Sequence, residues 1–118
     1  MNVLGKQKQS FSWAYNNKTN EEINKIITNF ANGRNVYVVD LVINDGTATF
    51  TTYSKIGYED LVNELIAERY TIQDELAIQR KHQKGVNQEE FNEYYEFVEQ
   101  CKVRAKTFIA ERERVTNG

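Results

Sequence analysis

Residues 88–114 read QEEFNEYYEFVEQCKVRAKTFIAERER. Positions spaced alternately by three and four residues form a mainly apolar series along this segment: Phe91, Tyr94, Val98, Cys101, Ala105, Phe108 and Arg112. This spacing draws one narrow stripe along a helix, and such a stripe packs against another helix. The pattern predicts a long C-terminal helix around which the rest of the chain is organised.

Two shorter helices are predicted before it, within residues 57–115. The first has an apolar face with helical spacing, made by Tyr58, Leu61, Val62, Leu65, Ile66 and Tyr70. Thr71, followed by Asp74 and Glu75, is typical of a helix start, so a second helix is expected over residues 72–83 and is ended by Gly85. A single helix bent at Thr71 is the alternative. Asn87 and Glu90 are expected to cap the long helix.

The first half of the chain has the pattern of a small sheet with one helix. Large rings alternate with small residues over residues 11–15, which predicts a short strand. Thr19 and Glu22 have the capping-box spacing, so a helix is expected over residues 20–32, with Gly33 at its end.

A β-hairpin is predicted over residues 36–53. In its first strand, Tyr37, Val39, Leu41 and Ile43 are expected on one face, and Val36, Val38, Asp40 and Val42 on the other. Residues 44–46 read Asn-Asp-Gly, which supplies the positive-φ residues of a tight turn. The return strand is expected over residues 47–53. The fold class is therefore α+β, a single domain over residues 1–118, with the order β-α-β-β-α-α-α. Residues 1–57 form a sheet-and-helix half and residues 58–118 a three-helix half.

Composition and charge restrict the function classes. The chain is 40% hydrophobic and 27% charged, as in ordinary globular proteins. Residues 1–57 hold six Lys and Arg against four Asp and Glu, and residues 58–118 hold nine against thirteen. The acidic helical half lacks the basic excess of a phosphate-binding surface, so nucleic-acid binding is disfavoured. One cysteine, no basic-then-apolar start and no apolar run of about 20 residues favour a protein of the cytoplasm, outside the membrane.

Candidate chemical groups are few. Asp40 inside an apolar strand could act as a general base with Tyr or Glu partners, but a carboxylate at a sheet surface is the commoner role. His82 and Cys101 are single residues of their kind, and one of each falls short of a zinc-ligand set. No catalytic residue, metal or cofactor is therefore expected. The basic cluster of Arg80, Lys81 and Lys84 could contact an acidic partner or nucleic acid, although positive charge also suits a helix C-terminus.

Two side chains lie off the stripe of the long helix, namely Phe97 and Val103. Each is expected to contact another surface, so they form a candidate interaction surface with Arg80 and Lys81. The long helix itself has two alternatives. It packs within the chain against residues 58–70, or it pairs with the same helix of a second copy.

Two segments of the helical half have a specific sequence: residues 58–78, with the run Tyr-Thr-Ile-Gln-Asp-Glu-Leu-Ala-Ile over residues 70–78, and Glu-Gln-Cys-Lys over residues 99–102. In these segments the helical half resembles a group of small proteins from bacteriophages and prophages of gut bacteria. Many of these proteins are encoded near tail or baseplate genes, and they lack an assigned activity. The resemblance implies a non-enzymatic protein of the host-bacterium cytoplasm or the virion, whose partner is a second copy or a host or phage protein.

Overall fold

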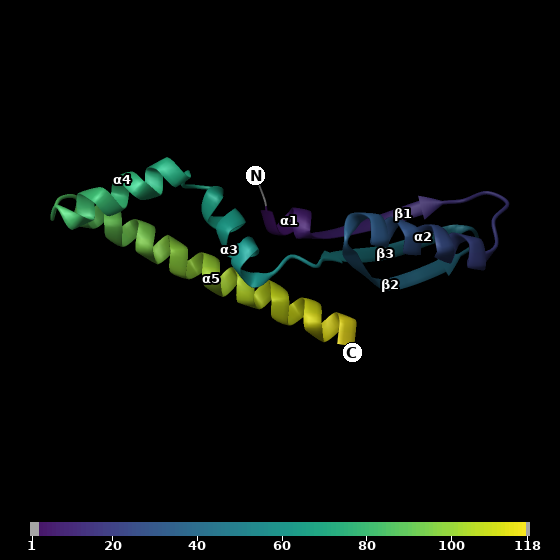
Figure 1. Cartoon of the computed structure of the whole chain (residues 1–118). Coiled ribbons are helices and arrows are strands. Elements are labelled where there is room, and N and C mark those ends of the chain that lie inside the picture. Colours follow the sequence, from purple (N-terminus) through teal and green to yellow (C-terminus); the bar gives the residue numbers. More distant parts are fainter. Residues whose placement is uncertain (1–2, 118) are drawn as a thin grey trace. The chain divides into compact units, whose positions relative to one another are not determined.

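The computed structural model describes residues 3–117 and has an α+β fold (Figure 1). Its elements are α1 (Val3–Gln7), β1 (Lys8–Ala14), α2 (Asn20–Arg34), β2 (Val36–Asn44), β3 (Thr47–Ser54), α3 (Tyr58–Ala67), α4 (Ile72–Gln83) and α5 (Gln88–Asn117). The predicted class, the antiparallel sheet and the element order are confirmed. The short helix α1 is an element that the sequence does not predict, because residues 1–10 carry no clear periodicity.

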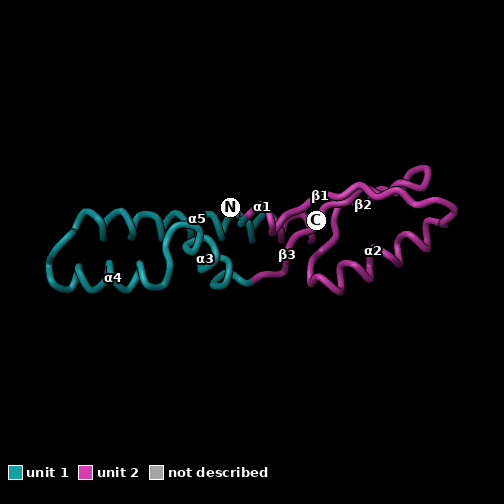
Figure 2. The backbone as a smooth tube through the Cα atoms, turned by 90° about the horizontal axis from the view of Figure 1, so that it is seen from above, with its two compact units in different colours: residues 1–3, 57–111 teal, residues 4–56, 112–118 magenta. Residues whose placement is uncertain are grey.

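The chain divides into two compact units, which are coloured separately in Figure 2. Unit 1 comprises residues 1–3 and 57–111, and unit 2 comprises residues 4–56 and 112–118. The break at Gly57 lies beside the predicted boundary between the two halves. The last turns of α5 nevertheless belong to unit 2, so the halves are not separate stretches of sequence. The expectation of a single domain stays a prediction.

In unit 2, a three-stranded antiparallel sheet with the order β1-β3-β2 packs against α2. The core cluster consists of Ile23 and Ile27 from α2 with Ala48 and Phe50 from β3, and the β1 rings pack against it. Phe11 lies opposite Phe50 in the register, with their ring centroids 5.3 Å apart. Phe11, Trp13 and Tyr15 thus face the core together, as the alternation predicts.

Helix α2 begins as predicted and ends two residues later than predicted. Thr19 and Glu22 form the reciprocal capping box, with both hydrogen bonds at 3.1 Å. The expected end at Gly33 is wrong, because Gly33 continues the helix. Asn35 makes the left-handed turn instead, with φ of 57°, and the chain then enters β2 directly. Asn tolerates this conformation better than most residues, so Asn35 can end the helix where the sequence predicts that Gly33 would.

The β2–β3 turn has the predicted tight geometry. Asp45 has φ of 50° and Gly46 has φ of 77°, as a two-residue hairpin turn requires. The amide of Tyr15 donates to the Gly46 carbonyl at 2.7 Å. A Cβ at Gly46 would lie 2.7 Å from the carbonyl oxygen of Tyr15, so the position needs glycine for its space as well as its φ.

Strand β2 departs from the predicted alternation at Asp40. The pairing with β3 shifts between Val39 and Val42, and Asp40 has φ of 56°. Two residues of β2 therefore lie opposite one residue of β3, which is a β-bulge. Val38 packs on the core before the bulge, and Leu41 and Ile43 pack on it after the bulge. The expected division into one face of odd positions and one of even positions is wrong, since the extra residue reverses the alternation.

In unit 1, Thr71 separates α3 from α4 and confirms the predicted break. The Thr71 hydroxyl accepts from the Asp74 amide at 3.0 Å, and the Asp74 carboxylate accepts from the Thr71 amide at 2.9 Å. The α3 residues Leu61, Val62, Leu65 and Ile66 are buried, as their spacing predicts. The prediction that Tyr70 lies on the same helical face is wrong, because α3 ends at Ala67. Tyr70 lies in the segment between α3 and α4, and its ring packs against the Tyr94 ring of α5.

Helix α5 buries the predicted stripe within the chain. Cys101 and Ala105 are both 0% exposed, and Phe108 is buried as well. Earlier along the helix, the Tyr94 hydroxyl donates to Glu75 of α4 at 3.1 Å, and the Phe91 ring stacks on His82 with centroids 3.7 Å apart. These contacts lie within the chain, to α4 and to Tyr70, whereas the intramolecular alternative named residues 58–70 alone. Pairing with a second copy stays a prediction.

Candidate interaction surfaces

Phe97 contacts residues of its own unit. Its ring centroid lies 5.5 Å from that of Tyr70, and the Arg69 guanidinium lies 5.3 Å above it. Phe97 is half-buried. The off-stripe position is thus occupied by the segment between α3 and α4, which leaves only part of the ring for another molecule.

Val103 remains exposed, at 63% of its side-chain and backbone surface. It lies two residues from the fully buried Cys101, which is roughly 200° around the helix. A shallow depression of about 390 Å³ surrounds it, lined by Glu99, Gln100, Val103 and Arg104. Val103 therefore marks the middle of the solvent side of α5, which also carries the exposed Tyr95.

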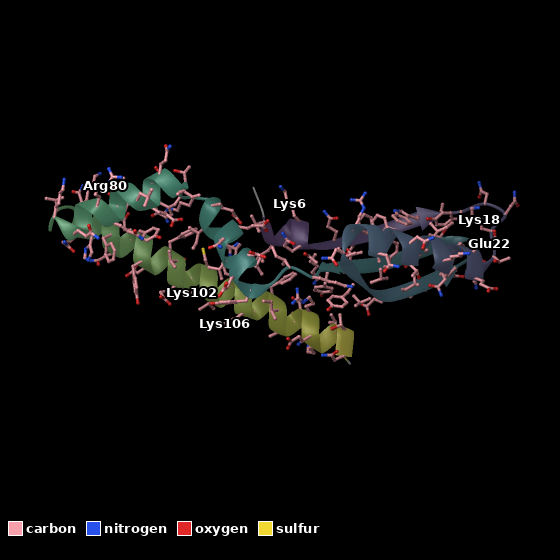
Figure 3. The ribbon with its side chains drawn as sticks, viewed as in Figure 1. Lys6, Lys18, Glu22, Arg80, Lys102 and Lys106 are labelled. Atoms are coloured by element: carbon pink, nitrogen blue, oxygen red, sulfur yellow. The ribbon has the colours of Figure 1, made fainter. Side chains whose placement is uncertain are left out.

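Charge is ordered along this side of α5. With Val103 as the reference, helical geometry places Glu96, Glu99 and Lys106 within about 60° of it. We call Glu96, Glu99, Val103 and Lys106 the α5 outer face. The two carboxylates precede Val103 and the ammonium follows it, and Figure 3 shows Lys102 and Lys106 projecting from the helix. Glu99 forms a 3.3 Å ion pair with Lys102, in which both side chains are nearly half exposed.

Arg80 and Lys81 lie in the last turn of α4, where positive charge suits the helix C-terminus. Lys81 is paired with Glu90 of α5 at 3.5 Å. Arg80 is exposed (Figure 3). Because the Glu90 carboxylate neutralises Lys81, the basic cluster offers a nucleic acid less positive charge than the sequence suggests.

A cavity of about 320 Å³ lies between α4 and α5, lined by charges of both signs that include Arg69, Asp74, Lys81 and Glu90. The Asp74 carboxylate is bound to the Thr71 amide, and Glu90 is bound to Lys81. These polar groups stabilise the helix start and the helix pair. Their contacts account for their positions without a ligand.

The candidate chemical groups lie in different environments. Asp40 is exposed at the bulge of β2, beside a depression of about 370 Å³ lined mainly by hydroxyl residues of β1 and β3. His82 is stacked on Phe91 in unit 1, and its Nδ1 lies 3.1 Å from Gln88 Oε1. Cys101 is ten residues beyond Phe91, or about 15 Å along the helix axis. Cys101 and His82 therefore lie apart and do not form a catalytic pair.

Burial raises the pKa of the Cys101 thiol; Arg104 lowers this pKa and Glu68 raises it, each by less than burial does. A raised pKa lowers the thiolate fraction at neutral pH and so lowers the reactivity of the side chain. Cys101 is consequently a packing residue of α5, as its place on the stripe predicts.

The free edge of β1 is a surface that sequence reasoning missed. β1 and β2 are the outer strands of the sheet, and β1 keeps an unshifted register with β3 over all seven of its residues. Alternation in residues 11–15 identified a strand, but it could not say whether the strand is central or outer. That depends on the pairing with β3, which is distant in sequence.

Among the described residues, no helix is both long and apolar enough to cross a membrane. No group of three or more His, Cys, Asp or Glu side chains that could hold a metal ion occurs within residues 3–117. No protein-family model, curated protein or solved structure matches the chain.

Proposed function

We propose that this protein acts by binding protein surfaces and not by catalysis, and that the α5 outer face is its first contact surface. The exposure of Val103 carries the proposal. A β-branched apolar side chain stands in the middle of a thirty-residue helix, with 63% of its surface in solvent, while Cys101 and Ala105 on the opposite side of the same helix are fully buried. The partner that this face fits best is a second copy of the chain.

The order of charges supports that partner. When two copies of α5 run antiparallel about a twofold axis near Val103, Glu99 of one copy approaches Lys106 of the other. Both residues lie on the same flank of Val103, so the symmetry brings them together twice. The contact places opposite charges together and covers Val103. A parallel pair would place like charges opposite each other.

The Glu99–Lys102 ion pair does not oppose this arrangement. Both side chains are nearly half exposed, and exposed pairs of this kind contribute little to stability, about 0–1 kcal/mol. Glu99 is therefore free to exchange its partner on association at small cost.

The phage and prophage resemblance of the helical segment supports a role in virion assembly, as a structural accessory, or as a modulator of a host protein in the bacterial cytoplasm. Self-association suits such a role because assembly proteins work through repeated contacts. Tail or baseplate genes beside this gene would support that assignment, and a metabolic operon around it would oppose it.

Charge reversal tests the α5 contact. Sedimentation equilibrium should show weaker self-association for Glu99→Lys, because two like charges then meet. The double variant Glu99→Lys with Lys106→Glu should restore it. Val103→Glu should remove the contact, with an unchanged circular dichroism spectrum because the site is exposed. Equal association of all four proteins would overturn the proposal.

A further inference from the structure

The free edge of β1 differs from the free edge of β2. On β2, the bulge at Asp40 interrupts the row of backbone groups and twists the strand, a common protection of an outer strand against pairing. β1 has an unbroken register from Lys8 to Ala14, and Lys8 is its one charged residue. Within the described residues, β1 pairs with β3 alone. The β2 edge is therefore protected against pairing by its bulge, whereas the β1 edge has a regular backbone.

The backbone groups on that edge can be identified from the turn. The amide of Tyr15 donates to Gly46, so it faces the β3 side. Amides two residues apart along a strand face the same way, so those of Trp13 and Phe11 also face β3. The amides and carbonyls of Ser10, Ser12 and Ala14 therefore face away from β3, into the space where another strand would lie.

Aromatic side chains stand beside this edge. Phe11 and Trp13 are half-buried, and their rings form a cluster with Phe30 of α2 and Phe50 of β3 at centroid distances of 4.8–5.4 Å. A strand added at β1 would cover the part of these rings that is still in solvent. The edge thus offers both backbone hydrogen bonds and apolar area.

We propose that β1 pairs antiparallel with β1 of a second copy, with the twofold axis at Phe11. In this register Ser10 of each copy lies opposite Ser12 of the other, so the two hydrogen-bonded pairs beside the axis join residues whose backbone groups face the edge. Lys8 lies opposite Ala14. Phe11 meets its own copy on the core face, where it extends the aromatic cluster. The two Lys8 residues stay about 20 Å apart, because six residues separate them along the strand.

The second copy is favoured over an unrelated peptide by this self-complementarity. The seven residues of β1 lie opposite one another over their full length in one register, with no like charges opposite each other. The product is a continuous six-stranded sheet.

This contact is independent of the α5 outer face and does not rest on it. Two different twofold contacts on one chain lead to assemblies larger than a dimer, since each copy can bind one neighbour through α5 and another through β1. Either contact can fail without the other, and variants separate them.

Sedimentation equilibrium of Val103→Glu tests the β1 contact by itself. This variant should form dimers as its concentration rises. Adding Ser12→Pro removes an edge-facing N–H without removing a bond to β3, a position at which an outer strand accepts proline. The combined variant should be monomeric, with half the limiting mass. A monomeric Val103→Glu variant at high concentration would overturn the proposal.

A charge pair keeps the test valid if the proline variant does not fold. In the Val103→Glu background, Ser10→Glu with Ser12→Lys places opposite charges across the proposed contact and should retain the dimer. Ser10→Lys with Ser12→Lys places like charges there and should give monomer. Equal masses for the two charge variants would contradict the register.

Discussion

The guanidinium of Arg112 donates a 2.7 Å hydrogen bond to the backbone carbonyl of Ser54, 58 residues earlier in the chain. The same nitrogen donates to the carbonyl of Ile56 at 2.8 Å. Both carbonyls belong to the segment in which β3 ends. Arg112 also lies 5.9 Å from the Tyr37 ring centroid. The side chain therefore fastens the last turns of α5 to the end of the sheet.

Replacing Arg112 by Met should lower the stability of the protein by about 1–3 kcal/mol, because two partly buried carbonyls lose a charged donor. Urea unfolding followed by circular dichroism measures the change. Arg114→Met is the matched control, since Arg114 is exposed on the same helix and should change stability by roughly 0.5 kcal/mol at most. Equal effects of both changes would show that charge, and not the hydrogen bonds, matters.

Local signals account for most of what the sequence predicts correctly. The boxes at Thr19 and Thr71, the turn at Asp45 and Gly46, and the stripe through Cys101 depend on residues at most a few positions apart. Even Arg112 was placed correctly on the stripe. Its partners could not be predicted, because helical spacing gives the direction of a side chain and says nothing of the element it meets.

Predictions from the sequence were wrong where one residue reverses the alternation of a strand, or where a segment distant in sequence supplies the contact of a side chain. Asp40 reads as one more alternating position unless its left-handed backbone is known. From the sequence, Phe97 has no partner within the chain. Its partner is Tyr70, which the helical spacing assigned to the face of α3 but which lies beyond the end of that helix. Val103 is exposed, and its expected contact with another surface stays a prediction. The β1 edge depends on a pairing with β3 that no local pattern encodes.

Asp40 should be replaceable when its conformation is respected. Asp40→Gly and Asp40→Asn should leave stability nearly unchanged, because Gly and Asn adopt a positive φ readily. Asp40→Val should lower stability by about 1–2 kcal/mol, since a β-branched residue is strained there. Thermal unfolding of the three variants measures this order. A large loss in Asp40→Asn alone would indicate a role for the carboxylate, as the enzyme alternative requires.

Two glycines should respond to alanine with opposite signs. Gly33 lies inside α2 with open space around its Cα, so Gly33→Ala should raise stability by about 0.5–1 kcal/mol. Gly46→Ala should lower it by about 2 kcal/mol or more, because alanine is strained at a φ of 77° and its Cβ would meet the Tyr15 carbonyl. Urea midpoints at constant slope give both values. A stabilising Gly46→Ala would contradict the turn geometry.

The two capping carboxylates give part of the stability a defined pH dependence. The pKa of Glu22 is held below its ordinary 4.5 by the hydrogen bond from the Thr19 amide, and that of Asp74 below 3.8 by the bond from the Thr71 amide (Glu22 is labelled in Figure 3). A carboxyl whose folded pKa is lowered stabilises the fold above its unfolded pKa. That contribution is lost as the pH falls through the folded value, so the window lies below 4.5 for Glu22 and below 3.8 for Asp74.

Wild type should therefore lose more stability between pH 7 and pH 3 than the double variant Glu22→Gln with Asp74→Asn, because the variant has no charge to lose at either helix start. At neutral pH the variant should be the less stable protein, and the difference should shrink as both carboxylates become protonated. Urea unfolding at a series of pH values measures it. Glu113→Gln, which removes an exposed carboxylate far from any helix start, should keep the pH dependence of wild type. Parallel curves for wild type and the double variant would mean that folding does not lower the pKa of either carboxyl.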